Sequence, residues 1–335
     1  MTIPSGKYDP SRRDLFKGLA GGIAAAGLTG SLASPATAKA ALAGRQAPGF
    51  YRRKVGDIEV TALLDGTLSF DQGTVLAMIP KASVEAVKVL NEKYFVPASG
   101  QITLAVNAFV VNTGDKLVLV DTGAADKFGP TAGALPAALA AAGFEASAID
   151  AVVLTHAHPD HAAGMVNAKG EAVFANAEVV LTETEQQFWA DPGTRTRLPD
   201  AQKGMVDVAA AALKPYGSRI RLIANAADVV PGLSSLSLPG HTPGHTGYRV
   251  ASGKDQLLII GDAVHIAEWM FDMPEWSFTF DVEPSVAVAT RMKLFDMASA
   301  DRLLIAGSHM PFPGFGYVGR EGKAYRYIPA PWAPL

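Results

Sequence analysis

The chain of 335 residues contains no cysteine. This excludes disulfide bonds, thiolate metal ligands and a cysteine nucleophile, so any bound metal ion must be held by nitrogen and oxygen ligands. Charged residues are also few, at 18% of the chain. The 29 Lys and Arg nearly balance the 32 Asp and Glu, which gives a formal net charge of −3. Because neutralising nucleic-acid phosphates needs a positive surface, we expect no nucleic-acid substrate.

Long hydrophobic runs are scarce too. The apolar stretch over residues 18–34 is diluted by Gly and Ala, whereas a membrane-spanning helix needs about 20 strongly apolar residues. This stretch follows the paired arginines Arg12 and Arg13 and precedes Ala36-Thr37-Ala38. A basic start, a short apolar region and an Ala-x-Ala site are typical of a secretory signal, and the paired arginines indicate the twin-arginine type. A membrane anchor is the weaker interpretation.

We therefore expect cleavage after Ala38, with Ala40 as the alternative site. The product would be periplasmic or secreted and would have no stable membrane insertion. The predicted organisation is a twin-arginine signal peptide over residues 1–38, an N-terminal extension over 39–54 and one large domain over 55–335. Hydrophobic residues make up 49% of the chain, which is enough for a sizeable core.

Short apolar or alternating segments separated by turn residues dominate both halves of this domain. They predict strands over residues 58–64, 103–112, 116–121, 151–155, 179–182, 234–238, 247–251, 256–260 and 302–306. Helices are expected over 131–142, 183–190 and 200–213, and a further helix is opened by Pro284. Strands in both halves with helices between or after them favour two packed sheets flanked by helices over a parallel doubly wound sheet.

The histidines are concentrated in one place. Only seven occur in the chain, yet three of them and an aspartate fall within six residues, His156, His158, Asp160 and His161. The apolar run before them reads as a buried strand, so the imidazoles lie on the loop at its end. This spacing indicates a metal site, in which the carboxylate is either a ligand or a base.

The same pattern of strand and then metal-competent residue recurs along the chain. Asp121 follows Leu-Val-Leu-Val, His241 follows Leu-Ser-Leu-Pro-Gly, Asp262 follows Leu-Leu-Ile-Ile-Gly and His309 follows Leu-Leu-Ile-Ala-Gly-Ser. A lone Asp at a strand end is more often a turn former, and His245 is read as an ordinary loop histidine. The complete set is more specific than any one of its members.

This set resembles the metallo-β-lactamase superfamily over roughly residues 55–320. The resemblance implies an α+β fold, the αββα four-layer sandwich, with the site along one edge, and makes the domain over 55–335 a hydrolase. It implies that His156, His158 and His241 bind a first metal ion, that Asp160, His161 and His309 bind a second, and that Asp262 bridges them. Asp121 would support the site through hydrogen bonds. Asp160 and Asp262 would be the catalytic carboxylates.

Two divalent ions about 3.5–4 Å apart can share a hydroxide that attacks without a protein nucleophile. The expected reaction is therefore metal-assisted hydrolysis. Zinc is the first choice for imidazole and carboxylate ligands, with manganese, iron and cobalt as alternatives.

A narrower resemblance is to the methyl parathion hydrolases and their dihydrocoumarin-type lactonase relatives. The matching stretches are 116–125, Phe128-Gly129-Pro130-Thr131, the histidine loop, 240–246, and Ser308-His309 with Phe312-Pro313-Gly314. The resemblance implies a secreted dimetal homodimer that hydrolyses aryl phosphotriesters, lactones and aryl esters. True β-lactamases of the superfamily lack an aspartate at the position of Asp262, so β-lactam hydrolysis is not expected.

Aromatic residues gather just after Asp262. Trp276, Phe278 and Phe280 alternate and would share one face of an extended segment, and with Phe128 and Trp189 they would line the substrate pocket. A dimer interface or ordinary core is the alternative for each aromatic. His265 occupies a position that is aliphatic in efficient parathion hydrolases. We expect it to narrow the cavity, so that aryl esters or lactones are the main substrates and phosphotriesters a side activity.

Two other classes remain as alternatives. A glyoxalase-II-like thioesterase or a sulfur dioxygenase could share the fold, but the export signal and the missing basic cluster count against an intracellular enzyme that acts on glutathione conjugates. A non-catalytic scaffold with a structural metal is the second, although structural sites are closed whereas this set implies open positions.

Overall fold

A computed structural model of the chain describes residues 42–97 and 100–335. The predicted signal peptide over residues 1–38 lies outside these residues. A compact unit extends over Gln46–Leu335. Within the described residues, no helix combines the length and the apolar character needed to cross a membrane.

The strands of this unit form two sheets, each of seven strands among the described residues. The first sheet has the order β1 to β7, with bounds Phe50–Val55, Ile58–Asp71, Gln101–Asn112, Leu117–Val120, Ala151–Val153, Glu178–Thr182 and Ile220–Ile223. Strands β1 to β4 are antiparallel neighbours, whereas β4 to β7 are parallel. The first sheet is therefore mixed.

The second sheet runs from β14 back to β8. Strands β8 to β14 have the bounds Asp228–Val230, Leu233–Ser237, Thr246–Ser252, Asp255–Ile259, Leu304–Ala306, Phe315–Glu321 and Ala324–Pro329. All neighbours are antiparallel except β11 and β12, which run parallel.

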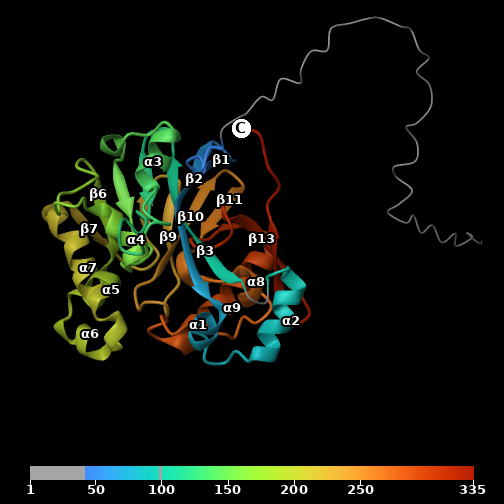
Figure 1. The fold of residues 1–335 in the computed structure, drawn as a ribbon. Coiled ribbons are helices and arrows are strands. Elements are labelled where there is room, and N and C mark those ends of the chain that lie inside the picture. Colours follow the sequence, from blue (N-terminus) through green and yellow to red (C-terminus); the bar gives the residue numbers. More distant parts are fainter. Residues whose placement is uncertain (1–41, 98–99) are drawn as a thin grey trace, which may run out of the picture. The chain divides into compact units, whose positions relative to one another are not determined.

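Helices cover the outer faces of the two sheets (Figure 1). Helices α1 to α9 have the bounds Gln72–Ala77, Val84–Tyr94, Leu135–Ala141, Pro159–Ala162, Glu183–Ala190, Pro192–Arg197, Gly204–Leu213, Ala267–Met270 and Pro284–Ala300. One buried cluster joins α3 and α7 to the first sheet, and another joins α2, α8 and α9 to the second. A third cluster, which includes Val120, Val153, Ile259 and Ala306, fills the space between the sheets. The layers are helix, sheet, sheet and helix, as expected for an αββα sandwich.

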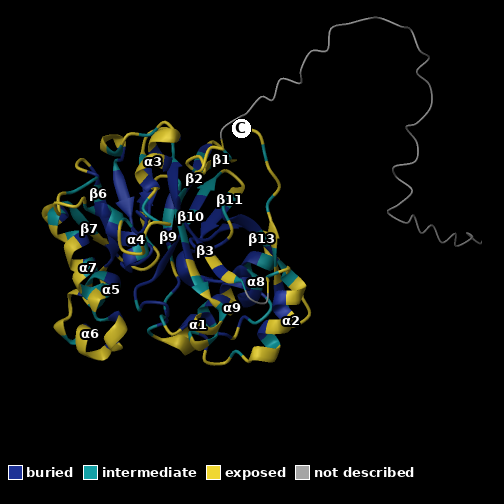
Figure 2. Ribbon diagram, viewed as in Figure 1, coloured by how far each residue is buried: buried dark blue, intermediate teal, exposed yellow. Residues whose placement is uncertain are grey.

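The central strands are buried on both faces, whereas the outer helices are exposed on one side (Figure 2). Most expected elements lie within a few residues of their predicted bounds. The predicted helix over 131–142 starts only at Leu135, because the buried carboxylate of Asp65 accepts hydrogen bonds from the backbone N–H groups of Gly133 and Leu135 and holds the preceding residues in a turn. Strand β1 lies in the segment predicted as an extension and pairs with β2.

The sheet geometry brings the loops of the predicted site together. Val120 of β4 pairs with Val153 of β5, and Ile259 of β11 pairs with Ala306 of β12, both in parallel register. Parallel neighbours end at the same edge of a sheet. The loop after β4 therefore lies beside the loop after β5, and the loop after β11 lies beside the loop after β12.

Candidate metal centre

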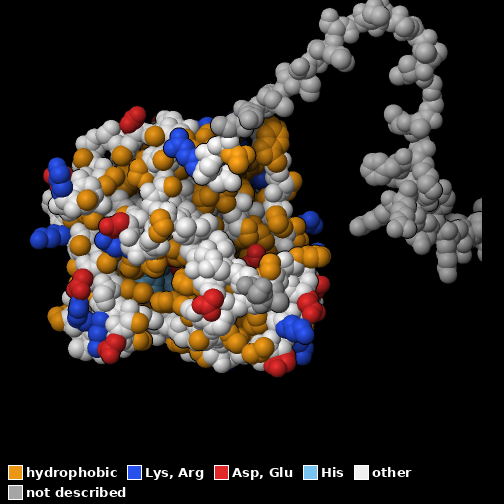
Figure 3. Space-filling model, in the orientation of Figure 1, with side chains coloured by type: hydrophobic (Ala, Val, Ile, Leu, Met, Phe, Trp, Pro, Cys, Tyr) orange, Lys and Arg blue, Asp and Glu red, His pale blue; other side chains and the backbone are white. Residues whose placement is uncertain are grey.

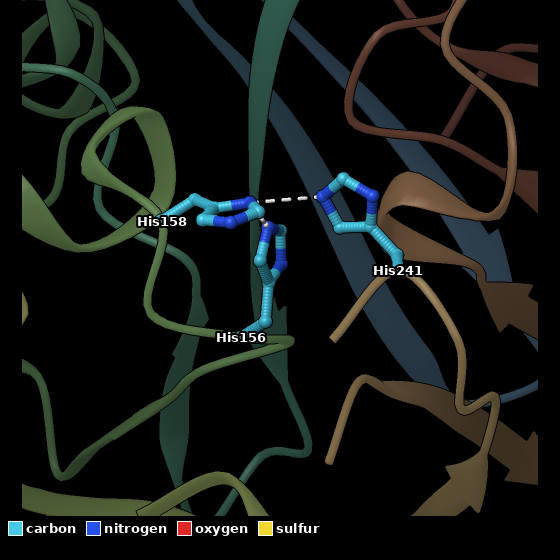
Figure 4. A group of neighbouring side chains, drawn as sticks. All are labelled: His156, His158 and His241. Carbon is cyan, nitrogen blue, oxygen red and sulfur yellow. Dashed lines mark hydrogen bonds between the residues drawn. The ribbon is translucent and has the colours of Figure 1, made fainter. Parts of the chain in front are cut away.

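Three histidine rings form the first group of the site. His156 and His158 lie on the loop between β5 and α4, and His241 lies on the loop between β9 and β10 (Figure 4). His158 Nδ1 lies 2.9 Å from His156 Nε2 and 2.9 Å from His241 Nε2. All three residues are buried. Three ring nitrogens thus converge on one point.

The second group combines carboxylates and imidazoles. Asp160 and His161 lie on α4, Asp262 follows β11 and His309 follows β12. Their ligand atoms lie within 4.8 Å of one another, as do those of the first group.

Asp262 stands between the two groups. Its Oδ2 atom lies 3.4 Å from His241 Nε2 and 3.2 Å from His309 Nε2, and its Oδ1 atom lies 3.2 Å from His161 Nε2. One carboxylate therefore faces ligands of both groups, which is the placement expected of a bridging residue.

The nitrogen on the far side of several rings has a fixed partner. His161 Nδ1 lies 2.9 Å from Asp121 Oδ2, His241 Nδ1 lies 2.9 Å from Asp281 Oδ1, and His309 Nδ1 donates to Ala105 O at 2.8 Å. Such partners fix the ring orientation and leave the other nitrogen free to bind a metal. Asp121 also accepts hydrogen bonds from the N–H and the hydroxyl of Thr155, which anchors the start of the histidine loop.

His245 has a different place. Its Nδ1 donates to Leu238 O and its Nε2 accepts a hydrogen bond from the N–H of Asp262. Burial and the neighbouring His241 lower the pKa of His245 to about 3. Both nitrogens are used, so His245 holds the Asp262 loop and offers no lone pair to a metal ion.

Electrostatics distinguishes the two groups. Burial, together with neighbouring imidazoles, holds the pKa of His156 and of His158 well below the usual value, so both rings are neutral. Burial opposes protonation of His161 as well, but Asp262 and nearby carboxylates outweigh it and raise its pKa well above the usual value. Burial likewise opposes protonation of His309, and Asp262 and Asp160 raise its pKa to about 10. The second group thus contains carboxylates that favour positive charge beside them, whereas the first group consists of neutral imidazoles.

The residues fit a pair of divalent cations. The ring nitrogens of the first group face one another at 2.9 Å. Because these imidazoles are neutral, at most one nitrogen of each facing pair carries a proton, and the other presents a lone pair. His161 Nε2 and Asp262 Oδ1 are buried without a hydrogen-bond partner in the described part of the chain. Unpaired buried polar atoms are costly unless something binds them, and imidazole with carboxylate suits zinc and related ions.

A cavity of about 260 Å³ opens over the two groups. Histidine atoms are visible in a hollow on the face drawn in Figure 3. Five of the ligand candidates contribute to its floor, and its other walls are apolar except for His265; the lining residues are Leu68, Phe70, Met78, Leu104, Phe128, His158, Asp160, Ala201, Met205, His241, Asp262, His265, Phe278, Phe280 and His309. The size and lining of the cavity suit a small, largely apolar ligand.

The predicted pocket residues divide into two sets. Phe128, Phe278, Phe280 and His265 line the cavity. The His265 ring stacks on that of Phe278, with centroids 4.7 Å apart and planes at 27°. Neither ring nitrogen of His265 has a hydrogen-bond partner among the described residues.

The two predicted tryptophans lie elsewhere. Trp189 is only 4% exposed and packs under the His158 ring, because its indole N–H donates to the buried Glu185. Trp276 is buried against Trp269. Residues 276–280 form no strand, because residues 276–278 have no regular structure and residues 279–280 lie in a turn. Neither tryptophan lines the cavity, so the structure does not support them as pocket residues.

Several functional residues were not predicted. Asp281 and Glu185 hold the ligand loops, and Leu68, Phe70, Met78, Leu104, Ala201 and Met205 complete the cavity wall. The wall residues come from β2, β3, the residue after α1, the turn before α7 and the first turn of α7. Nothing in their local sequence marks them, because only the tertiary fold brings them to the site.

The family model of the metallo-beta-lactamase superfamily matches residues 102–309. Among similar solved structures, the hydrolase AbOPH of the beta lactamase superfamily is 33% identical, with a TM-score of 0.80, over 87% of this chain and 100% of that chain. AidC, a dizinc quorum-quenching lactonase in complex with the product N-hexanoyl-L-homoserine, is 27% identical, with a TM-score of 0.81, over 86% and 99%.

A probable metal-dependent hydrolase from Staphylococcus aureus shares the fold, at 22% identity and a TM-score of 0.69, over 84% of this chain and 100% of that chain. A comparison with curated protein sequences found no match.

Proposed function

The chain belongs to the metallo-β-lactamase superfamily and is a metal-dependent hydrolase, and from this membership we propose that it is a dimetal enzyme that hydrolyses lactones and aryl esters. We propose zinc as the metal, and phosphotriester hydrolysis as a side activity. The observation that carries the proposal is one cavity in which metal-competent side chains form the floor and aromatic rings form a wall.

Seven side chains would hold the ions. His156, His158 and His241 form one set, Asp160, His161 and His309 form the other, and Asp262 stands between them. When bound, two divalent ions would supply a water of lowered pKa and would polarise the ester carbonyl.

The chain's other side chains prepare this floor. Asp121 and Asp281 fix the rings of His161 and His241, so the site is ordered before a substrate arrives. The apolar wall excludes water from the bound ester and strengthens electrostatic interactions in the site. His265 keeps both ring nitrogens unpartnered beside Asp262, so its imidazole is available to orient a substrate oxygen by a hydrogen bond.

Cavity size and shape favour a small planar substrate. The volume of about 260 Å³ lies below the 300–1,000 Å³ that is usual for ligand sites. The stacked rings of His265 and Phe278 make one side flat. A fused aromatic lactone such as dihydrocoumarin matches this shape, whereas three substituents around a tetrahedral phosphorus do not lie flat.

A relative of known activity supports the lactone class. AidC, which is 27% identical and similar over nearly its whole length, is a dizinc lactonase with a ring-opened homoserine product bound. We propose that this chain shares the lactone-opening reaction and that its own wall residues select the substituent.

A panel of substrates tests the proposal. Metal-loaded protein would be assayed with dihydrocoumarin, N-hexanoyl homoserine lactone, an aryl acetate and methyl parathion, with S-lactoylglutathione as the thioester control. We expect the highest kcat/KM with a lactone or aryl ester. A higher kcat/KM with methyl parathion, or turnover of the thioester alone, would contradict the proposal.

We further propose that the protein is exported and works as a homodimer. The export proposal rests on the paired arginines and Ala-x-Ala motif of residues 11–38. The dimer proposal rests on the resemblance to the methyl parathion hydrolases. Light scattering that gave a monomer mass at micromolar concentration would contradict the dimer.

A further inference from the structure

Glu185 is a buried carboxylate that the proposed reaction does not use. It lies in the first turn of α5 and is 1% exposed. It does not line the cavity over the metal groups. A buried carboxylate is expensive unless its oxygens are well bonded, so its partners indicate why it is there.

All three hydrogen-bond partners of the Glu185 carboxylate are donors. Oε1 accepts from the N–H of Ala157 at 2.9 Å and from Trp189 Nε1 at 2.6 Å, and Oε2 accepts from the Thr242 hydroxyl at 2.5 Å. Because burial raises the pKa of Glu185 and these hydrogen bonds oppose that rise, the bonds stabilise the ionised form.

Each of these partners adjoins a ligand of the first group. Ala157 is the residue between His156 and His158, and Thr242 directly follows His241. The Trp189 ring packs edge-on against the His158 ring, with centroids 5.4 Å apart. One carboxylate thus has a hydrogen-bond partner beside each histidine of the first group.

The loop that carries His241, between β9 and β10, also lies close against the backbone of α5. A Cβ atom added at Gly244 would lie 2.2 Å from Glu185 N, so only glycine fits there. The Thr182 hydroxyl, next to α5, donates to Gly244 O at 3.0 Å. These contacts hold the loop at a fixed distance from α5, and the carboxylate then ties that loop to the histidine loop.

We propose that Glu185 is a positioning residue that fixes the histidine loop against the His241 loop, so that His156, His158 and His241 hold the first metal ion. The inference rests on the proposed metal centre. His161 and His309 have other anchors, Asp121 and Ala105 O. Loss of the carboxylate therefore weakens the first site selectively.

Zinc binding to full-length protein tests this, by competition with a chromophoric chelator. Wild type should bind about two ions. In Glu185→Ala the first-site affinity should fall about 10- to 100-fold, as for loss of other residues that orient metal ligands, while the second site keeps its affinity. Glu185→Gln, whose amide has one acceptor oxygen for three donors, should show a smaller loss, and it keeps the proposal testable if the alanine variant fails to fold.

Glu183→Gln is the matched control, because Glu183 lies in the same first turn of α5 but is exposed. It should bind zinc as wild type does. Thr242→Val removes the partner of Oε2 alone and should give a partial loss. With cobalt in place of zinc, Glu185→Gln should have a visible absorption spectrum that differs from that of wild type. In a separate assay of the zinc form, excess zinc should restore the kcat of Glu185→Gln.

Unchanged zinc affinity and cobalt spectrum in Glu185→Gln and Glu185→Ala would overturn the inference and leave the proposed function standing. Equal loss of affinity at both metal sites, with a matching fall in Tm, would also overturn the inference. That result would show that Glu185 stabilises the fold as a whole and does not position the first site. If wild type itself binds no zinc, the proposed function fails first.

Discussion

The metal-ligand candidates can be recognised from their spacing in the local sequence, whereas the residues that orient them cannot. His156, His158, Asp160 and His161 stand within six positions, which is a spacing that metal chemistry explains. Asp281 lies 40 positions from His241 and meets its Nδ1 only through folding. Likewise Trp189 looked like a pocket residue until the structure gave its indole N–H a buried partner, Glu185. Ligand types can be predicted from sequence, whereas their supports depend on tertiary contacts.

His265 is the residue that we expect to set substrate preference. His265→Leu removes the ring that stacks on Phe278 and the unpartnered nitrogens beside Asp262. A change of this size in a pocket shifts specificity by roughly 10- to 200-fold. The ratio of kcat/KM for methyl parathion to that for dihydrocoumarin should rise by at least about tenfold, measured side by side on metal-loaded protein.

His265→Gln is the informative companion variant, since it keeps a polar group but loses the flat ring. An unchanged ratio in both variants would mean that His265 has no part in selection.

At the scale of elements, the strands with apolar alternation were predictable and the edge strands were not. Strands β3, β4 and β11 lie close to their expected bounds because their residues are buried on regular faces. Strand β1, with the sequence Phe-Tyr-Arg-Arg-Lys-Val, is polar and half exposed, as edge strands usually are. Its pairing with β2 could not be inferred from its own residues.

Residues 263–281, which contribute to the cavity wall, are mostly irregular apart from the short helix α8, and Arg291 of α9 contacts this segment. The buried Arg291 donates to the carbonyl oxygens of Ala263, Pro274 and Trp276 at 2.6, 2.9 and 2.5 Å. Its guanidinium also lies 4.0 Å from Asp281 Oδ2. Arg291 thus ties three backbone positions of the wall that carries Phe278 and Phe280 to α9.

Arg291→Lys should loosen this wall. A lysine cannot match the fork of the guanidinium, and each buried carbonyl left unpaired costs about 1–3 kcal/mol. We expect the free energy of unfolding, measured in urea, to fall by about 2–4 kcal/mol. We also expect a rise in KM for dihydrocoumarin.

Lys293→Met, on an exposed position of the same helix, should change stability by less than about 0.5 kcal/mol. Equal stability of Arg291→Lys and wild type would show that the wall does not depend on Arg291.

At the scale of the whole molecule, the site is a junction of the two sheets. Asp121 and the histidine loop follow strands of the first sheet, and Asp262 and His309 follow strands of the second. Composition and pattern favoured two packed sheets, but the parallel pairing of β11 with β12 joins segments that are distant in the sequence. The resemblance to a known superfamily implied the four-layer sandwich and a site along one edge, but it did not specify this pairing.

Metal removal should therefore destabilise the whole molecule. Ions bound at the junction stabilise the folded state by about 3–4 kcal/mol when present at 100 to 1,000 times their dissociation constant. Chelation with excess EDTA should lower Tm by several degrees, and zinc should restore it, as followed by calorimetry. The same Tm with and without chelator, in protein shown to have lost its metal, would contradict ligation across the two sheets.

Export makes a separate prediction for the full-length chain. Expressed in a bacterium with a twin-arginine pathway, the protein should appear in the periplasm or medium with Lys39 as its first residue, or Ala41 for the alternative site. Arg12→Lys with Arg13→Lys should retain the precursor in the cytoplasm. N-terminal sequencing of exported protein that still began at Met1 would refute cleavage.

The central claim is a two-metal centre that opens lactones, and titration of metal-free protein with zinc while dihydrocoumarin hydrolysis is followed tests it most directly. We predict that activity rises to a plateau at about two zinc ions per chain, and that turnover at the plateau exceeds that of methyl parathion. Full lactonase activity at one ion per chain, or none at any zinc concentration, would contradict the account.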